Sequence, residues 1–427
     1  MPVSRRTFLT GSATLAAATL QPEPGYTASP SAPAPVAPTS NATGALPSPA
    51  VIALNRMAYG PRPGDIGSVT NMGLASYVEQ QLNPQGIDDS ACEARIAAAR
   101  MRITYSAGDG YGACNELRPL TTLNKSVSEL WRLSRWDIKM AGHERMLPFE
   151  EVRAATWIRA VHSKRQLQEV MVDFWHNHFN VYPVSASAIS CAFPAYDRTV
   201  IRKHSLGNFR TFLEAVATSP AMLYYLDNVS NKAGGGEGGN ENFARELIEI
   251  HTLGIDAYLK FYDDRRNIGD DGKGNARGYI DDDVYETARC FTGWTVANGA
   301  WNGRDGDLPS TGEFLYEQNW HDTSSKTVLS PDGYPNVPRN QPNMSDGRRV
   351  LDMLARHPAT ARHLCTKLCR RFIADDPPQR VIDAAAAEWP AHVNLPDQIK
   401  RVMRVILLSE EFSSTWGKRS SGLLSSW

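Results

Sequence analysis

The chain has 427 residues, of which 42% are hydrophobic and 21% are charged, a composition typical of a folded protein with a sizeable core. Its 45 basic and 46 acidic residues give a formal net charge of -1, so the charge balance argues against a nucleic-acid or anionic-membrane partner. Six cysteines in a chain of this length exclude a small disulfide-stapled scaffold.

The first twenty residues predict export. The adjacent Arg5 and Arg6 precede a short, weakly apolar stretch, residues 11–20, and together they resemble a twin-arginine translocation signal. Because that pathway carries folded proteins, often with a cofactor already inserted, we expect the protein in the periplasm or the cell envelope. Residues 21–49 are rich in Pro, Ala and Ser, and they predict a flexible linker.

The remaining residues, 50–427, predict a single large, mostly α domain. Apolar residues recur at helical spacing in many segments, including 51–57, 74–82, 127–139, 149–173, 241–253, 281–294, 345–373 and 398–412. Residues 297–343 are rich in Gly, Asn, Asp and Pro, and they predict a long irregular insertion in which only Gly312–Glu317 has a strand pattern. No run of about 18 apolar residues follows residue 20, so the sequence predicts no transmembrane helix.

The segment VMVDFWHNHFNV, residues 170–181, contains the first candidate metal ligands, His176 and His178. Imidazole is the side chain that most commonly binds transition metals. In an extended chain the two rings share a side, whereas in a regular helix they point about 200° apart. They can therefore share one ion only if the helix loosens near Trp175; otherwise we expect His176 to pair with Asp173. The alternative is two buried histidines that only form hydrogen bonds.

The segment NENFARELIEIH, residues 240–251, supplies further candidates on a predicted helix. Glu246 is a candidate carboxylate ligand or general base, and His251 at the helix end is a candidate ligand. Arg245 is a candidate catalytic partner, although an ordinary Arg245–Glu249 salt bridge at i,i+4 spacing is the simpler interpretation. The Gly-rich stretch before this helix lacks the Lys-Ser/Thr ending of a phosphate-binding loop.

The segment NWHDTSSK, residues 319–326, lies in the predicted insertion. His321 is a candidate late metal ligand, and Asp322 is a candidate carboxylate that orients it. The alternative is an exposed polar turn. The chain contains neither the Gly-x-Ser-x-Gly elbow of serine hydrolases nor a His-Glu-x-x-His zinc motif.

Several segments occur in an order that is known from one family. They are DFWHNHFNV, SPAMLYYLDN, GNENFARELIEIHTLGI, DVYETARCFTGWTV, NWHDTSSKTVL and HPATARHLCTKLCRRF. Through them the chain resembles, over nearly its whole length, the family called "domain of unknown function 1800". The resemblance implies an exported, mostly helical bacterial protein that often occurs beside a second exported protein, its expected partner. It implies no particular reaction, and the segment GYIDDDV is more acidic than the corresponding family pattern.

The residues together predict an exported metalloprotein enzyme, with an oxidoreductase favoured over a hydrolase because the export route carries proteins already loaded with cofactor. The predicted ligand pool consists of four histidines: His176, His178, His251 and His321. The predicted catalytic residues are Glu246, Arg245 and Asp322. Such a set suits Zn, Fe, Cu or Mn, which the sequence does not distinguish. The alternative is a non-catalytic cell-envelope protein that binds a protein partner or a polysaccharide near Trp294, Trp301 and Trp320.

Overall fold

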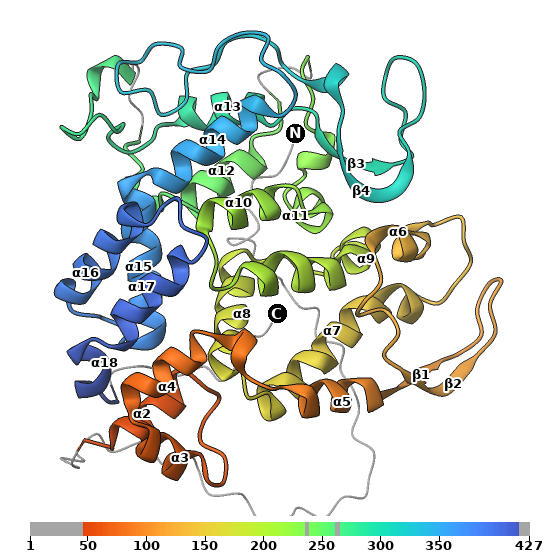
Figure 1. Ribbon diagram of the computed structural model, residues 1–427. Coiled ribbons are helices and arrows are strands. Elements are labelled where there is room, and N and C mark those ends of the chain that lie inside the picture. The colour runs from red at the N-terminus through yellow and green to blue at the C-terminus, as the bar shows by residue number, and fades with distance from the viewer. Residues whose placement is uncertain (1–45, 235–238, 261–264, 418–427) are drawn as a thin grey trace, which may run out of the picture. The chain divides into compact units, whose positions relative to one another are not determined.

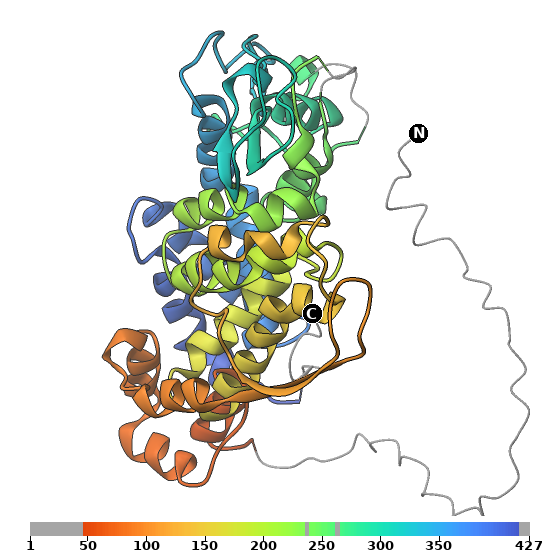
Figure 2. The same cartoon turned by 90° about the vertical axis from the view of Figure 1, so that its right-hand side faces the viewer.

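The structure is a computed structural model of the chain, and it describes residues 46–234, 239–260 and 265–417. Helices make up 54% of it and strands 9%, which confirms the predicted mostly α fold (Figures 1 and 2). The predicted signal peptide and nearly all of the predicted linker lie outside the described residues. Within those residues, no helix combines the length and the apolar character needed to cross a membrane.

The described domain begins with four short helices: α2 (Pro49–Arg56), α3 (Asp65–Met72), α4 (Leu74–Gln81) and α5 (Ser90–Ala98). The Ser48 hydroxyl accepts the Val51 N–H at the start of α2, where Pro49 supplies a pre-set φ angle. The Arg56 guanidinium donates to the carbonyl of Phe412, so the first helix of the domain is tied to its last.

A β-hairpin that the sequence analysis did not predict follows α5. Strand β1 (Arg100–Tyr105) pairs antiparallel with β2 (Cys114–Pro119), with Ile103 opposite Glu116. Strand β1 alternates between exposed polar residues and less exposed apolar ones, but most side chains of β2 are exposed and show no such alternation. That alternation is the pattern by which a strand is normally detected.

The next helices differ from the predicted ones in their bounds. The expected helix 127–139 is only α6 (Val127–Leu130) followed by a 3-10 turn, η2 (Trp131–Ser134). The expected helix 149–173 is two helices, α7 (Gly142–His162) and α8 (Gln166–His178). The break falls at Ser163, whose backbone is extended, and the carboxylate of Asp89 accepts the Ser163 hydroxyl and the Lys164 N–H. A distant carboxylate thus satisfies the backbone at the break.

Helix α8 is buried along nearly its whole length. It lies among α9 (Ser187–Ala195), a π-helical turn η3 (Tyr196–Arg202), α10 (Phe209–Ala217) and α11 (Pro220–Tyr225) in the middle of the domain (Figure 1). Trp175 is fully buried and meets Phe179 and Phe212 with ring centroids 5.7 and 5.2 Å apart. Because all side chains of α8 except those of Gln168 and Asn177 are buried, its other polar residues must find partners inside the protein.

The predicted irregular insertion follows α12 (Asn242–Glu249) and α13 (Asp281–Cys290). It contains one antiparallel pair, β3 (Trp294–Asn298) and β4 (Ser310–Tyr316), in which Trp294 faces Tyr316. The expected strand pattern at Gly312–Glu317 is therefore correct, apart from its bounds. A single 3-10 turn, η7 (Gln318–Trp320), leads into the rest of the insertion.

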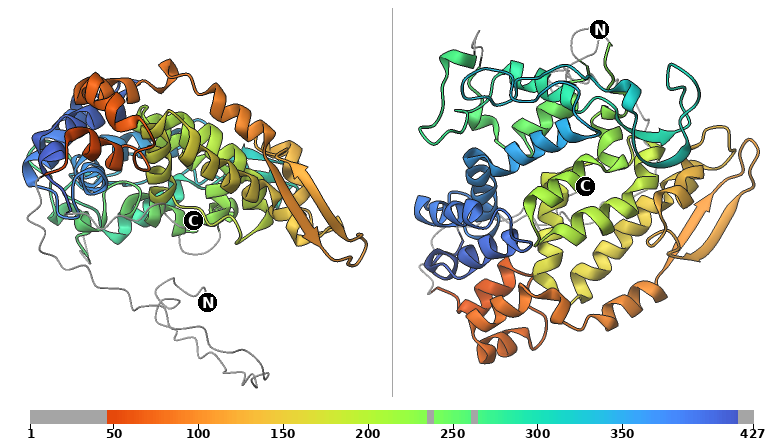
Figure 3. Two further views of the ribbon diagram at one scale, coloured as in Figure 1. Left: turned by 90° about the horizontal axis from the view of Figure 1, so that it is seen from below. Right: turned by 45° about the horizontal axis from the view of Figure 1, so that its top comes forward.

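The domain ends with five helices: α14 (Ser345–Arg356), α15 (Pro358–Phe372), α16 (Gln379–Ala391), α17 (Gln398–Leu407) and α18 (Glu410–Ser414). They form a layer that contacts α2 and α4 from the start of the domain, as the views in Figures 1 and 3 agree. Cys365 and Cys369 on α15 are buried and free, as are the other four cysteines. This pair therefore packs in the core and forms no disulfide bridge.

Candidate functional site

The two histidines of α8 point to different surroundings. The helix remains regular through His178, so it does not loosen near Trp175. His176 Nε2 lies 3.0 Å from Asp197 Oδ1, whereas His178 Nε2 lies 3.1 Å from the carbonyl oxygen of His251. The two rings therefore cannot share one ion in this conformation. Asp173, the predicted partner of His176, acts on the ring through its charge, and the ring Nε2 is hydrogen-bonded to Asp197.

His176 belongs to a buried ion cluster. Arg202 donates to Asp197 Oδ2 at 3.2 Å and to both carboxylate oxygens of Glu169 at 2.8 and 2.9 Å. The π-helical turn places Asp197 and Arg202, five residues apart, on one side. Burial raises the pKa of Asp197, but Arg202 and His176 more than offset burial and hold that pKa well below its usual range. The cluster places two carboxylates against one guanidinium and an imidazole inside the core.

His178 instead belongs to a group that we name the histidine cluster: His178, His251, His363 and Lys367. The ring centroid of His178 lies 6.0 Å from that of His251 and 6.2 Å from that of His363. Lys367 Nζ lies 2.8 Å from His178 Nδ1. His178 and His251 are buried, whereas His363 and Lys367 are partly exposed, so the cluster extends from the core to the surface.

The hydrogen bonds of the cluster fix which nitrogens carry protons. A carbonyl can only accept, so His178 donates Nε2–H to His251, and His363 donates Nε2–H to the Ile250 carbonyl at 3.1 Å. His178 Nδ1 then accepts from the Lys367 ammonium. His251 Nδ1 is buried and has no hydrogen-bond partner among the described residues. His178 and His363 thus direct Nδ1 lone pairs, rather than N–H groups, away from the backbone carbonyls that they bond.

The electrostatics keep these imidazoles neutral. Burial, followed by the charge of Lys367, lowers the pKa of His178 well below its usual value and that of His251 to about 3. Burial also lowers the pKa of Lys367 to about 8. Neutral imidazole is the form that binds a metal or accepts a proton.

Local sequence explains how the cluster assembles. Helix α12 ends at Glu249, and Gly254 turns the chain with φ 87° and ψ 156°, values that essentially only glycine adopts. A Cβ on Gly254 would lie 2.6 Å from His363 Nδ1, so the turn packs directly on the third histidine. His363 and Lys367 lie one turn apart on α15 and share a face. That i,i+4 spacing was the available signal for two residues that the sequence analysis did not select.

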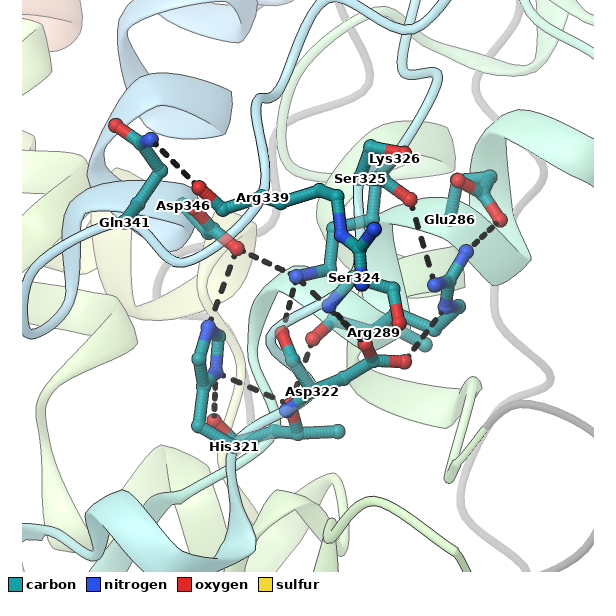
Figure 4. Close-up of polar contacts among 12 residues, drawn as sticks. Glu286, Arg289, His321, Asp322, Ser324, Ser325, Lys326, Arg339, Gln341 and Asp346 are labelled. Atoms are coloured by element: carbon teal, nitrogen blue, oxygen red, sulfur yellow. Dashed lines mark hydrogen bonds and ion pairs between the residues drawn. The ribbon is translucent and has the colours of Figure 1, made fainter.

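His321 lies in a separate polar network, which Figure 4 shows. Its Nε2 is 3.1 Å from Asp346 Oδ2, and its Nδ1 is 2.9 Å from the Thr292 carbonyl oxygen. Lys326 Nζ, fully buried, lies 2.5 Å from the same Asp346 oxygen. The carboxylate that orients His321 is therefore Asp346 at the start of α14, and not the predicted Asp322. Because His321 and Lys326 are buried, an exposed polar turn is the wrong interpretation.

Asp322 faces away from His321 and pairs with Arg289 of α13, whose Nε lies 2.8 Å from Asp322 Oδ2. Arg289 also pairs with Glu286, as Figure 4 shows. Burial raises the pKa of Asp322, but Arg289 and its other partners lower it to about 2. These ion pairs attach the insertion to α13.

Arg245 and Glu246 follow each other on α12 but have different surroundings. Arg245 Nη1 lies 3.1 Å from Asp281 Oδ1, so its partner is on α13, and the simpler interpretation of an Arg245–Glu249 salt bridge is wrong. Tyr258 donates to the other oxygen of Asp281 at 3.0 Å. The carbonyl oxygen of Glu246 accepts the His251 N–H at 2.9 Å. The backbone of Glu246 is therefore bonded directly to a residue of the histidine cluster. A chemical role for its carboxylate stays a prediction.

The predicted ligand pool is thus divided among three places. Only His178 and His251 come together, while His176 pairs with Asp197 and His321 with Asp346. Across residues 46–234, 239–260 and 265–417, no three His, Cys, Asp or Glu side chains are already arranged to hold a metal ion.

The tryptophans expected to bind a polysaccharide do not form a stacking surface. Trp294 is 0% exposed and Trp320 is 8% exposed, so both belong to the packed interior, whereas Trp301 is 59% exposed. A stacking site needs open aromatic faces. The structure leaves only one of the three residues available for such contacts.

Comparison with known proteins identifies the family but no activity. Residues 52–422 match the family model described as "Protein of unknown function (DUF1800)". No curated protein and no solved structure matches the chain. The match begins within α2 and extends past the end of α18. The chain therefore belongs to the DUF1800 family.

Proposed function

We propose that this protein is an exported, metal-dependent enzyme that uses the imidazoles of the histidine cluster as its metal ligands. The observation that carries the proposal is the unpartnered, buried Nδ1 of His251 beside His178 and His363, whose Nε2–H groups are anchored on backbone carbonyls. A carbonyl bonded to one ring nitrogen is the usual way in which a protein orients an imidazole that binds a metal through the other.

The donor set fits borderline transition metals. Three neutral imidazoles suit Zn, Cu or Fe, whereas Mn prefers oxygen ligands. The rings are not yet arranged around one point, so ion binding requires side-chain movement. His363 and Lys367 are partly exposed and therefore have room to move. Glu246, on the helix that leads to His251, is the proposed carboxylate ligand or general base.

A metal bound here would act as a Lewis acid or as a redox centre. We retain an oxidoreductase as the favoured class, with a hydrolase as the alternative, because the predicted export route carries proteins that are already loaded with cofactor. Arg245 and Asp322 form ion pairs with Asp281 and Arg289, and the proposal gives them a positioning role.

Metal analysis of exported protein made without a His tag tests the proposal. We expect stoichiometric transition metal in the wild type, and loss of that metal in His178→Ala and in His251→Ala. The exposed His162 provides the matched control, because His162→Ala removes an imidazole far from any predicted ligand role. Absence of metal from the wild type, or unchanged metal in both cluster variants, contradicts the proposal. A redox-active metal supports the oxidoreductase, and zinc supports the hydrolase.

A further inference from the structure

We infer that Lys367 is an internal plug of the histidine cluster: its ammonium occupies the His178 lone pair that a metal ion would use, so an ion binds only when Lys367 withdraws. The inference rests on the proposed function of the cluster. It assigns a role to a residue on α15 that is not itself a proposed ligand.

The geometry makes the two cations mutually exclusive. His178 donates its Nε2–H to the His251 carbonyl, so its only lone pair in the ring plane is on Nδ1. Lys367 Nζ lies 2.8 Å from that Nδ1. An ion such as Zn²⁺ binds imidazole at about 2.0–2.1 Å along the same direction. One lone pair cannot serve both, so the ammonium must leave before the ion arrives.

The charge of Lys367 affects all three histidines of the cluster. After burial, it is the largest influence that disfavours positive charge on His178, His251 and His363, and in each case it lowers the pKa of the ring. An approaching cation meets the same repulsion. Removal of this charge should therefore favour the ion at all three nitrogens, and not at His178 alone.

Lys367 is placed so that it can move. It lies on the partly exposed face of α15, one helical turn after His363, and its flexible four-carbon stem carries a strongly hydrated head group. Rotation of the side chain towards water requires no movement of the helix. The plug can thus open without unfolding any part of the described domain.

Zn²⁺ titration against a chromophoric chelator tests the inference. Zinc is a suitable probe because it binds nitrogen ligands more tightly than Fe²⁺ or Mn²⁺. We expect Lys367→Met to bind Zn²⁺ about tenfold more tightly than the wild type, or better, because a neighbouring charge is removed. Lys367→Arg keeps the charge and should show no such gain. Lys203→Met, at an exposed position, should match the wild type.

The outcomes separate the two proposals. If His178→Ala loses Zn²⁺ but Lys367→Met binds it no more tightly than the wild type, the inference about Lys367 is contradicted. The proposal that the histidine cluster binds a metal is then still supported. If neither the wild type nor Lys367→Met binds Zn²⁺, the proposed function is contradicted, and so is the inference about Lys367 that rests on it.

A second measurement uses the wild type alone and so avoids any folding defect of a variant. Lys367 and Lys203 are acetylated briefly with acetic anhydride, with and without Zn²⁺, and the modified peptides are quantified by mass spectrometry. We expect Zn²⁺ to raise the labelling of Lys367 relative to Lys203. If Zn²⁺ leaves the labelling of Lys367 relative to Lys203 unchanged or lowers it, the inference that Lys367 blocks the site is contradicted.

Discussion

The chemistry that His178 can perform depends on which of its ring nitrogens carries the proton. Its bond to the His251 carbonyl fixes the proton on Nε2 and leaves Nδ1 to accept from Lys367. His176, two residues earlier, has the same side chain but lies beside a carboxylate and an arginine. The two residues therefore have different surroundings because α8 directs their side chains to opposite sides.

Gly254 is the residue whose replacement should disturb the cluster most selectively. In Gly254→Ala, the backbone at φ 87° and the Cβ contact at 2.6 Å from His363 Nδ1 should together lower the free energy of unfolding by about 1–3 kcal/mol. Urea unfolding followed by circular dichroism measures this loss. Gly67→Ala is the matched control, since Gly67 is helical with open space around it and alanine should be neutral or slightly stabilising. Equal stability of the two variants would contradict the account.

At the scale of elements, α8 and the insertion show two ways of placing polar groups in a helical domain. Helix α8 is buried over most of its surface, and two of its polar faces meet clusters supplied by other elements, η3 on one side and α15 on the other. The insertion has little regular structure, and ion pairs to α13 and α14 hold it in place. Both arrangements bury charged groups. Removal of one partner should therefore lower the stability of the protein, because the other partner is left buried and unpaired.

The ion pair between Asp322 and Arg289 predicts a defined loss of stability in acid. Because the pKa of Asp322 falls to about 2 in the folded protein, the pair stabilises fully above the ordinary carboxyl pKa of about 3.9. That contribution disappears as pH falls through about 2. Because solvent screens this partly exposed pair, Asp322→Asn should lower the free energy of unfolding by roughly 1 kcal/mol at pH 6, and the difference should shrink towards pH 2.

Urea unfolding at several pH values measures the effect of this substitution. Asp109→Asn is the control, because Asp109 is 85% exposed and its pair with Lys139 is screened by solvent. A difference between Asp322→Asn and the wild type that does not change with pH would show that the ionised carboxylate is not the source of the stability.

At the scale of the whole molecule, helical spacing was enough to predict a single, mostly α domain. It was not enough to place the break at Ser163, because the carboxylate that stabilises the break comes from Asp89, far away in the chain. The β1–β2 hairpin was missed because only β1 carries an alternation of polar and apolar residues, whereas its partner β2 is mostly exposed and has none. Local patterns report local structure, whereas these features depend on contacts between distant segments.

The candidate site was predictable only in part for the same reason. His178 and His251 were recognised from their residue type, and the structure brings them together. His363 and Lys367 were missed because only the fold shows that α15 packs against the end of α12. His176 and His321 resembled ligands in the sequence, but their carboxylate partners, Asp197 and Asp346, lie on other segments.

Anomalous X-ray diffraction from crystals of the exported protein, collected at the absorption edges of Fe, Cu and Zn, tests the central claim most directly. The account predicts one strong peak at about 2.0–2.1 Å from a ring nitrogen of each of His178, His251 and His363, with Lys367 turned away. A cluster without a peak, in which Lys367 still donates to His178 beside an unpartnered His251, would contradict it.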